Sequence, residues 1–352
     1  MQIESDVPLA PFTTIGIGGP ARCFFRATTV DELREAIAWA AGHALPLFLL
    51  GGGSNLLISD DGFPGLVVRL DLRGISLESA DGTAVMVKVA AGEPWDAFVR
   101  YAVERGWAGI ECLSGIPGST GATPIQNVGA YGQDVSETIA RVEALDRTTG
   151  LVTWFTNREC RFGYRSSLFK NHERERYVVL SVTFRLRPGG PATIRYPELQ
   201  KSIEERGVAL DDLAGVRQSV IAIRKRKGMV LDPHDPDTRS DGSFFMNPVV
   251  TPAEYEAFAL RAPDAPHFPS GEEVKLSAAW LIEHAGFHKG YTHGNVGLSS
   301  KHSLAIINRG GGTAREVVEL VEMIQAGVRD AFGVEIHPEP NFIGLRTPGS
   351  FV

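Results

Sequence analysis

The chain has 352 residues, 43% of them hydrophobic, and a formal net charge of -7. This length exceeds the about 100 to 200 residues of a typical domain and predicts two or three domains, and the apolar fraction is typical of a soluble globular protein. The negative charge excludes a general nucleic-acid-binding surface, although a local basic patch is compatible with it, so we expect small molecules as partners.

Cysteine usage and the apolar runs suggest a compartment. Cys23, Cys112 and Cys160 are odd in number, far apart and outside any C-x-x-C or zinc-ligand spacing, so neither a disulfide framework nor a metal site is predicted. The opening MQIESDVPLAPF does not resemble a signal peptide, and the apolar runs are shorter than about 18 residues. We expect a cytoplasmic protein without membrane insertion.

The first half of the chain alternates between helix and strand patterns. DELREAIAWAAG, from residue 31, predicts a helix with Asp31 as its N-cap and Gly42 at its end. LPLFLL followed by GGGSNLLI predicts a strand, a glycine turn and a second strand, and VMVKVAAG alternates as a half-buried strand does. A helix in PWDAFVRYAVERG and several strands between residues 139 and 186 complete an α+β pattern, and RPGGP at 187–191 is a candidate domain edge.

The last third carries clearer helix signals. A basic helix-like stretch and a Pro/Asp-rich loop lie between residues 216 and 241. VKLSAAWLIEHAG predicts one helix, and Thr313 with Glu316 forms a capping box at the start of another. SLAIIN between them is a candidate buried strand.

Glycine-rich stretches are the first functional signal. GIGGPA at 16–21 satisfies a Rossmann pattern only formally, because no strand precedes it and Pro20 interrupts it, and GGG at 310–312 is most simply a loop. GGGSNLLI and IPGSTGATPIQNVGAYGQD offer neutral backbone donors without the G-K-[ST] of a P-loop. These two segments fit either a bound dinucleotide diphosphate or two structural loops.

Five motifs in a fixed order carry a family resemblance. GGGSNLLI, IPGSTGATPIQNVGAYG, ECRFGYRSSLFK, GSFFMNP and HPEPNFIG together resemble the UDP-N-acetylenolpyruvoylglucosamine reductases (MurB), type I-like. The resemblance implies an α+β FAD-binding fold of the vanillyl-alcohol oxidase type, with two α+β subdomains and a separate α+β substrate-binding domain. The implied segments are 1–75 and 76–190 for the two FAD-binding subdomains, 215–335 for the substrate-binding domain and 336–352 for a C-terminal segment that returns to the active site.

The resemblance also implies a noncovalent FAD and NADPH as the hydride donor. In the family the two glycine-rich loops line the FAD. The implied cofactor-binding residues are Gly51, Gly52, Gly53, Ser54, Asn55, Pro117, Gly118, Ser119, Gly121, Ala122, Asn127, Gly129, Ala130 and Tyr131.

The implied reaction reduces UDP-N-acetylglucosamine enolpyruvate to UDP-N-acetylmuramate, a step in peptidoglycan precursor synthesis. Arg165 matches the family's catalytic arginine, whose planar guanidinium opposes the charge that develops on the substrate carboxylate. Ser243 matches the serine that protonates carbon, and Glu339 matches an essential glutamate that donates a hydrogen bond to the intermediate. Without the resemblance these residues would be assigned to an ion pair, a turn serine and an exposed acid.

The substrate-binding residues rest on weaker matches. Tyr196, in RYPEL, lies where type I members carry a loop tyrosine that closes over substrate, and Asn247 belongs to the serine motif. Well-known type I members have lysines where this chain has Met246 and near Met229, so Arg226 and Lys227 become the candidates for the diphosphate. A solvated basic helix end explains that pair equally well.

Two other functions compete with the reductase. A flavoprotein oxidase or dehydrogenase of the same fold would often attach FAD through His or Cys, and neither glycine-rich loop contains one. A nonenzymatic nucleotide-binding protein would keep the loops without Arg165, Ser243 and Glu339. The oligomeric state is not predicted.

Overall fold

The computed structural model describes residues 1–171 and 173–345, and these residues form two compact units. Unit 1 comprises Met1–Asp6, Arg22–Gly52 and Pro64–Arg226, and unit 2 comprises Val7–Ala21, Gly53–Phe63 and the described residues from Lys227 onwards. The chain thus passes from unit 1 to unit 2 in the middle of the first glycine-rich loop. Each unit is described separately below.

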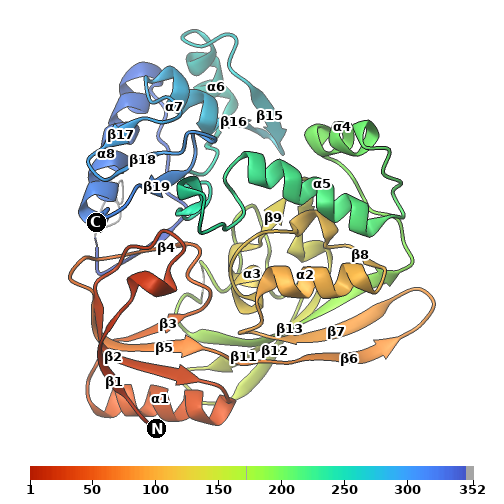
Figure 1. Ribbon diagram of the computed structural model, residues 1–352, viewed down its shortest axis with the longest axis vertical. Coiled ribbons are helices and arrows are strands. Elements are labelled where there is room, and N and C mark those ends of the chain that lie inside the picture. Colours follow the sequence, from red (N-terminus) through yellow and green to blue (C-terminus); the bar gives the residue numbers. More distant parts are fainter. Residues whose placement is uncertain (172, 346–352) are drawn as a thin grey trace. The chain divides into compact units, whose positions relative to one another are not determined.

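The first sheet of unit 1 has a helix on one face (Figure 1). Its strand order is β1 (Glu4–Pro8), β2 (Pro20–Ala27), β5 (Phe63–Leu70) and β3 (Leu47–Leu50), with β3 parallel to β5. Helix α1 (Val30–Gly42) buries Leu33, Ala36 and Ala40 against this sheet. Its N-cap is Thr29, which forms a capping box with Glu32, and not Asp31 as the sequence suggested. Thr29 is the cap because the helix begins at the next residue, Val30, and the Thr29 side chain accepts a hydrogen bond from the Glu32 amide.

The larger sheet of unit 1 is antiparallel. Its order is β12 (Val152–Thr156), β11 (Ile139–Asp146), β13 (Tyr177–Pro188), β7 (Val85–Ala90) and β6 (Ile75–Ala80), and β8 (Trp107–Ala108) also pairs with β13. The predicted alternation in β7 is confirmed, because Val85, Val87 and Val89 are buried. Helices α2 (Trp95–Glu104), α4 (Pro197–Glu205) and α5 (Leu213–Arg226) contribute to the core on this sheet (Figure 1).

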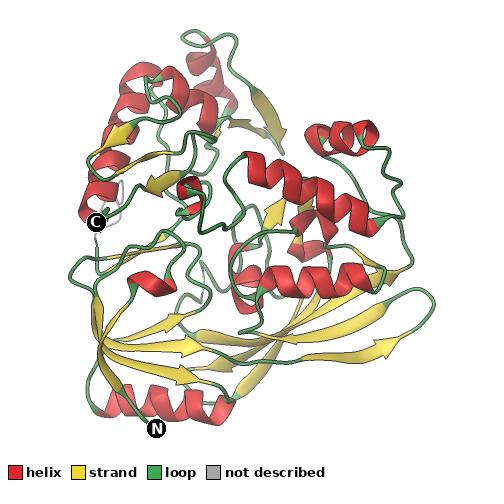
Figure 2. Ribbon diagram, viewed as in Figure 1, coloured by secondary structure: helices red, strands yellow, loops and turns green. Residues whose placement is uncertain are grey.

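Unit 2 combines short strands with helices (Figure 2). One sheet contains β14 (Val249–Val250), β16 (Glu273–Leu276) and β15 (His267–Ser270), and another contains β17 (Thr292–His293), β18 (Val296–Leu298) and β19 (Ile306–Asn308). A third pairing is parallel and joins β4 (Leu56–Ile58) to β20 (Asn341–Ile343). The helices are α6 (Pro252–Ala259), α7 (Ala278–His284) and α8 (Ala314–Phe332).

The predicted capping box of α8 is confirmed. Thr313 accepts a hydrogen bond from the Glu316 amide, and the Glu316 carboxylate accepts from the Thr313 amide in return. The apolar face that follows is buried in the core of unit 2 and includes Val317, Leu320, Val321 and Ile324. The capping box and the apolar face together fix the start and the orientation of this 19-residue helix.

Short elements lie in the connections. They are η1 (Ala10–Phe12), η2 (Glu111–Leu113), η3 (Thr120–Ala122), α3 (Thr123–Gln126), β9 (Gly129–Ala130), β10 (Gln133–Asp134), η4 (Val135–Glu137) and η5 (Pro236–Thr238). Within residues 1–171 and 173–345, no helix has both the length and the apolar character needed to cross a bilayer.

The two units do not follow the four predicted segments. Residues 7–21 and 53–63 pack with the C-terminal part of the chain, and α5 packs in unit 1. A division along the sequence cannot anticipate these exchanges, because they depend on tertiary packing. Which segments hold the cofactor and which hold the substrate stays a prediction, and residues 346–352 of the predicted C-terminal segment lie outside the described residues.

Candidate functional site

The first half of the GGGSN loop packs against the second glycine-rich segment within unit 1. A Cβ added to Gly51 would lie 2.8 Å from the Ser119 Oγ, and one added to Gly52 would lie 2.5 Å from the Gly118 Cα. The amide of Trp95 donates to the Gly118 carbonyl at 3.0 Å and fixes the second segment from the other side. The structure therefore brings the two predicted cofactor loops together at a contact that only glycine allows.

This contact gives a first prediction. Gly52→Ala will weaken FAD binding by about 5- to 150-fold, because overpacking of about 1 to 3 kcal/mol must be relieved by separating the two loops. Gly42→Ala is the matched control, since a Cβ at Gly42 meets nothing within 4 Å. Titration of the apoprotein with FAD measures both affinities. Equal FAD affinity of the Gly52 variant and the parent would show that this contact does not affect cofactor binding.

The second half of the loop lies in unit 2. Gly53 has a φ of +64°, and a Cβ there would meet the Phe12 carbonyl. Asn55 lies beside residues 339–341: its carbonyl accepts from the Asn341 amide at 3.0 Å, and its Nδ2 donates to the Glu339 carbonyl at 3.4 Å. A predicted cofactor residue and a predicted catalytic residue are therefore neighbours in this unit.

In the second glycine-rich segment, several backbone donors are already used. The Gly121 amide donates to the Ala91 carbonyl at 2.8 Å, and the Ala122 amide donates to the Ser119 carbonyl at 3.1 Å. A Cβ at Gly121 would lie 2.6 Å from the Ala91 Cβ, so Gly121 allows a close approach of two backbones. Gly121 and Ala122 can therefore contribute to cofactor binding only through the small size of their side chains. Backbone amides that bind the anion must belong to other residues.

Four further predicted cofactor residues lie in the hairpin of β9 and β10 or just before it. Asn127 ends α3 in a left-handed conformation and donates through Nδ2 to the Gly163 carbonyl at 2.9 Å. Tyr131 and Gly132 both have positive φ, of 50° and 81°, which suits a tight hairpin turn. Burial raises the pKa of the Tyr131 phenol to about 12, so this side chain stays protonated at neutral pH.

Arg165 lies against the same hairpin. Its Nη2 donates to the Gly129 carbonyl at 2.9 Å, and its Nη1 lies 3.4 Å from the Asn127 carbonyl. The Lys170 Nζ donates to the Arg165 carbonyl at 2.9 Å and so supports the turn. Arg165 has a φ of 51°, a left-handed conformation that is costly for a side chain of this size and is found preferentially at functional sites. The structure thus joins the predicted catalytic arginine to the predicted cofactor segment.

Ser243 and Glu339 come from two segments that pair in unit 2. The Glu339 amide donates to the Phe244 carbonyl at 2.8 Å, and the Met246 amide donates to the His337 carbonyl at 3.0 Å. Phe244 and Phe245 are buried in the core of unit 2 and anchor the serine segment there. Residues almost one hundred positions apart in the sequence are therefore held side by side by backbone hydrogen bonds.

The predicted substrate residues have less consistent surroundings. Tyr196 is half exposed at the N-cap of α4, and its ring stands perpendicular to that of Tyr131 at a centroid distance of 5.5 Å. The Asn247 Oδ1 accepts from the Ala278 amide at 3.0 Å, a structural bond at the start of α7. Arg226 is exposed at the end of α5, and Lys227 follows as the first residue of this part of unit 2. No observed contact assigns these four residues to a substrate.

Sequence reasoning missed three residues near these segments. Arg224, on α5, hydrogen-bonds the Tyr131 side chain, and burial lowers the pKa of its guanidinium. The His302 Nε2 lies 3.5 Å from the Ser243 Oγ. Asp241, two residues before Ser243, is buried. None of the three residues belongs to a recognisable sequence motif, although Asp241 stands next to the turn glycine Gly242.

Asp241 is a buried acid between three segments of unit 2. Its Oδ1 accepts from the Thr14 hydroxyl at 3.3 Å, and the amide of Leu56 also donates to the carboxyl group. Its Oδ2 is buried with no hydrogen-bond partner among the described residues. Burial raises the pKa of Asp241 to about 8, and the two hydrogen bonds only partly oppose this. The group is therefore predominantly protonated at neutral pH.

The raised pKa predicts a dependence of stability on pH. The pKa of Asp241 in the folded protein lies above its unfolded value of 3.8. The contribution of Asp241 to folding stability is therefore fully present below pH 3.8 and is lost as the pH rises through about 8. Asp241→Asn removes this loss. We expect the unfolding free energy of the variant to gain at least about 2 kcal/mol on that of the parent between pH 5 and pH 8. Urea unfolding at both pH values, with exposed Asp264→Asn as control, measures the gain, and parallel curves for Asp241→Asn and the parent would show that Asp241 ionises normally.

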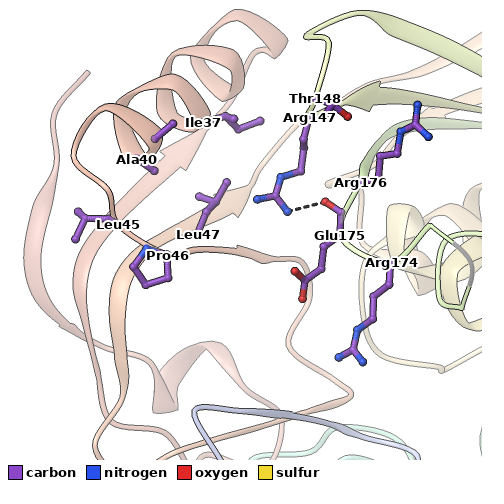
Figure 3. Close-up of a pocket in the computed structure, with 11 residues that line it drawn as sticks. Ile37, Ala40, Leu45, Pro46, Leu47, Arg147, Thr148, Arg174, Glu175 and Arg176 are labelled. Atoms are coloured by element: carbon purple, nitrogen blue, oxygen red, sulfur yellow. Dashed lines mark hydrogen bonds between the residues drawn. The ribbon is translucent and has the colours of Figure 1, made fainter.

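A cavity of about 630 Å³ lies elsewhere in unit 1 (Figure 3). The end of α1 and the following loop form its apolar side, and three arginines line the other: Arg147, Arg174 and Arg176. Arg147 donates to the Glu175 carbonyl at 2.6 Å, and Arg176 pairs with Asp146 at 2.9 Å. The cavity contains none of the predicted site residues, and two of its cations already bond within the wall, so it does not indicate a second catalytic centre.

Two family models match this chain. Residues 21–156 match a family described as an FAD binding domain, and residues 233–343 match the C-terminal domain of UDP-N-acetylenolpyruvoylglucosamine reductase. The reductase of Thermobifida fusca is 47% identical, with 97% of this chain and 98% of that protein covered. The reductase of Streptomyces coelicolor is 48% identical, with coverage of 97% and 90%.

A solved structure supports the same assignment. The crystal structure of the reductase from Thermus caldophilus superimposes with a TM-score of 0.67 at 26% identity and covers 97% of this chain and 99% of that one. These matches confirm the predicted α+β FAD-binding fold. The chain belongs to the UDP-N-acetylenolpyruvoylglucosamine reductase family.

Proposed function

We propose that this protein reduces UDP-N-acetylglucosamine enolpyruvate to UDP-N-acetylmuramate with FAD as cofactor and NADPH as reductant. The observation that carries the proposal is the backbone pairing of the Ser243 and Glu339 segments, which gives a proton donor and a carboxyl group fixed positions on one rigid scaffold. The family to which the chain belongs supports the substrate. Peptidoglycan synthesis, with its consequences for cell shape and division, and a cytoplasmic location are part of the same proposal.

The residues of the two glycine-rich loops fit an FAD. Gly51 and Gly52 leave no room for a Cβ against Gly118 and Ser119, so the loops present backbone at a surface free of side-chain bulk. We assign Asn127, Gly129, Ala130 and Tyr131, in and just before the hairpin of unit 1, to the same cofactor. When bound there, FAD supplies hydride chemistry that no side chain of the protein provides. Neither loop contains a His or Cys, which favours noncovalent binding.

Arg165 opposes charge during the reduction. As the carbon-carbon double bond of the enol ether is reduced, electron density moves into the adjacent carboxylate. The Arg165 guanidinium meets this charge, and its bond to the Gly129 carbonyl keeps it oriented before the reaction begins. The strained backbone of Arg165 is consistent with a position selected for function.

Ser243 supplies the proton. A hydride adds to the carbon that becomes the methyl group, and the neighbouring carbon forms its new C–H bond as the Ser243 O–H bond breaks. One hydride and one proton account for the two-electron reduction. Glu339 is held beside the serine segment by the hydrogen bond from its backbone amide to the Phe244 carbonyl, and in its protonated form it donates a hydrogen bond to the carboxylate of the intermediate. Tyr196, Arg226, Lys227 and Asn247 are the proposed contacts to the UDP-sugar.

Product analysis tests this function. The protein, FAD, NADPH and the enolpyruvyl substrate are incubated, and mass spectrometry follows the nucleotide sugar. The proposal predicts a gain of two hydrogen atoms, at least one of them as deuterium in deuterated water, and release of intact FAD when the protein is denatured. Consumption of oxygen without product, or flavin retained on the denatured chain, would favour an oxidase of the same fold. Tight FAD binding without turnover would favour a nonenzymatic nucleotide-binding protein.

A further inference from the structure

A histidine lies beside the proposed proton donor in unit 2. The His302 Nε2 is 3.5 Å from the Ser243 Oγ, at the long end of the hydrogen-bond range. Catalytic hydrogen bonds are often long in the absence of substrate and shorten in the complex. The geometry of the pair therefore allows Ser243 to act as a proton donor and His302 to return a proton to it.

The loop that carries His302 is tied to the serine segment itself. His302 lies between β18 and β19, and its carbonyl accepts from the Ala305 amide at 3.1 Å in a closed turn. From the same turn, the Leu304 carbonyl accepts from the Phe244 amide at 2.7 Å. Because Phe244 follows Ser243 directly, this backbone hydrogen bond holds the loop of His302 next to Ser243.

The other side of the loop is fixed by acids near η5. The Lys301 Nζ pairs with the Asp235 Oδ2 at 2.5 Å, and the Ser300 hydroxyl donates to the Asp237 Oδ2 at 2.6 Å. Ser300 and Lys301, the two residues before His302, are thus both bound to these acids. The loop is held at both ends, and the imidazole is kept at the serine by structure that does not depend on the imidazole.

We propose that His302 is a positioning residue that passes a proton to Ser243 as Ser243 protonates the substrate carbon. The inference rests on the proposed function. The Ser243 O–H bond breaks as the substrate C–H bond forms, and the Oγ takes its new proton from the Nε2 of the imidazolium. Neutral His302 then recovers a proton from water. An imidazole suits this task because it gains and loses protons near neutral pH, whereas a serine alkoxide is too basic to form alone.

Half-reaction kinetics of His302→Gln test the relay. Glutamine keeps a hydrogen-bonding side chain of similar reach but cannot transfer a proton. We expect FAD binding and flavin reduction by NADPH at parental rates, and reoxidation by the enolpyruvyl substrate slowed about 10²-fold. In mixtures of light and heavy water, the parent should show two protons in flight during reoxidation and the variant one. Reoxidation of His302→Gln at the parental rate would remove His302 from the proton path.

His302→Ala with added imidazole distinguishes chemistry from packing. A relay predicts that imidazole restores reoxidation in proportion to the imidazolium concentration, whereas a purely structural histidine predicts no restoration. If the parent itself fails to return to oxidised flavin with this substrate, the proposed function fails and the relay fails with it. If the parent turns over and imidazole restores nothing, only the relay is wrong.

Discussion

Ser243→Ala will leave flavin reduction by NADPH nearly unchanged and will slow flavin reoxidation by the substrate about 10³-fold or more. Only the second half-reaction needs a proton at carbon, and the methyl group of alanine has none to give. The variant should fold normally, because the anchoring of the segment comes from Phe244, Phe245 and backbone bonds that alanine preserves. Removal of the Ser243 hydroxyl should therefore affect only the second half-reaction.

Stopped-flow absorbance under anaerobic conditions measures both rates. Ser79→Ala is the control, since Ser79 is exposed on β6 in unit 1. Equal reoxidation rates in the Ser243 variant and the parent would remove serine from the mechanism. Loss of FAD from the Ser243 variant would show instead that the serine supports the cofactor.

Arg165→Ala should have the second large effect. We expect reoxidation by substrate to fall about 10³-fold, because the charge that opposes the developing anion is lost. Arg165→Lys should recover only part of this, since an ammonium lacks the planar fork of the guanidinium, which can grip two carboxylate oxygens while it keeps the 2.9 Å contact to Gly129. FAD affinity will fall less than the rate, because the hairpin keeps its own turn and its Asn127 bonds.

Arg161→Ala is a matched control for the arginine variants. Arg161 is exposed, lies four residues before Arg165 and has a similar left-handed φ of 49°, so both substitutions leave an alanine in the same strained backbone conformation. Single-turnover reoxidation and FAD titration are measured for each variant. A parental reoxidation rate in Arg165→Ala, or an equal loss in Arg161→Ala, would assign Arg165 to the structure of the turn.

The elements with complete local signals could be predicted from the sequence. Thr313, Glu316 and the apolar face that follows define α8 because capping and burial are both local properties. The alternation in β7 was equally reliable, because each valine contacts one face of a sheet. In α1 the helix is confirmed, and the predicted N-cap is wrong by two residues because Asp31 and Thr29 are both acceptable caps.

The candidate site divides in the same way. The five motifs indicated Ser243 and Glu339, and the structure adds that backbone pairing holds them together. Asp241 and His302 could not be found from the sequence, because their significance depends on burial between distant segments and on the position of a loop. Likewise, no pattern within GGGSN shows that Gly52 belongs to one compact unit and Gly53 to the other.

The return of oxidised flavin tests the central claim most directly. The purified protein with FAD is reduced anaerobically by one equivalent of NADPH, UDP-N-acetylglucosamine enolpyruvate is added, and the visible flavin band is followed. The account predicts that the band bleaches with NADPH and returns promptly with the substrate. A flavin that is bleached and stays reduced after the substrate is added would contradict the proposed reaction, and a protein that binds no FAD would contradict the cofactor loops as well.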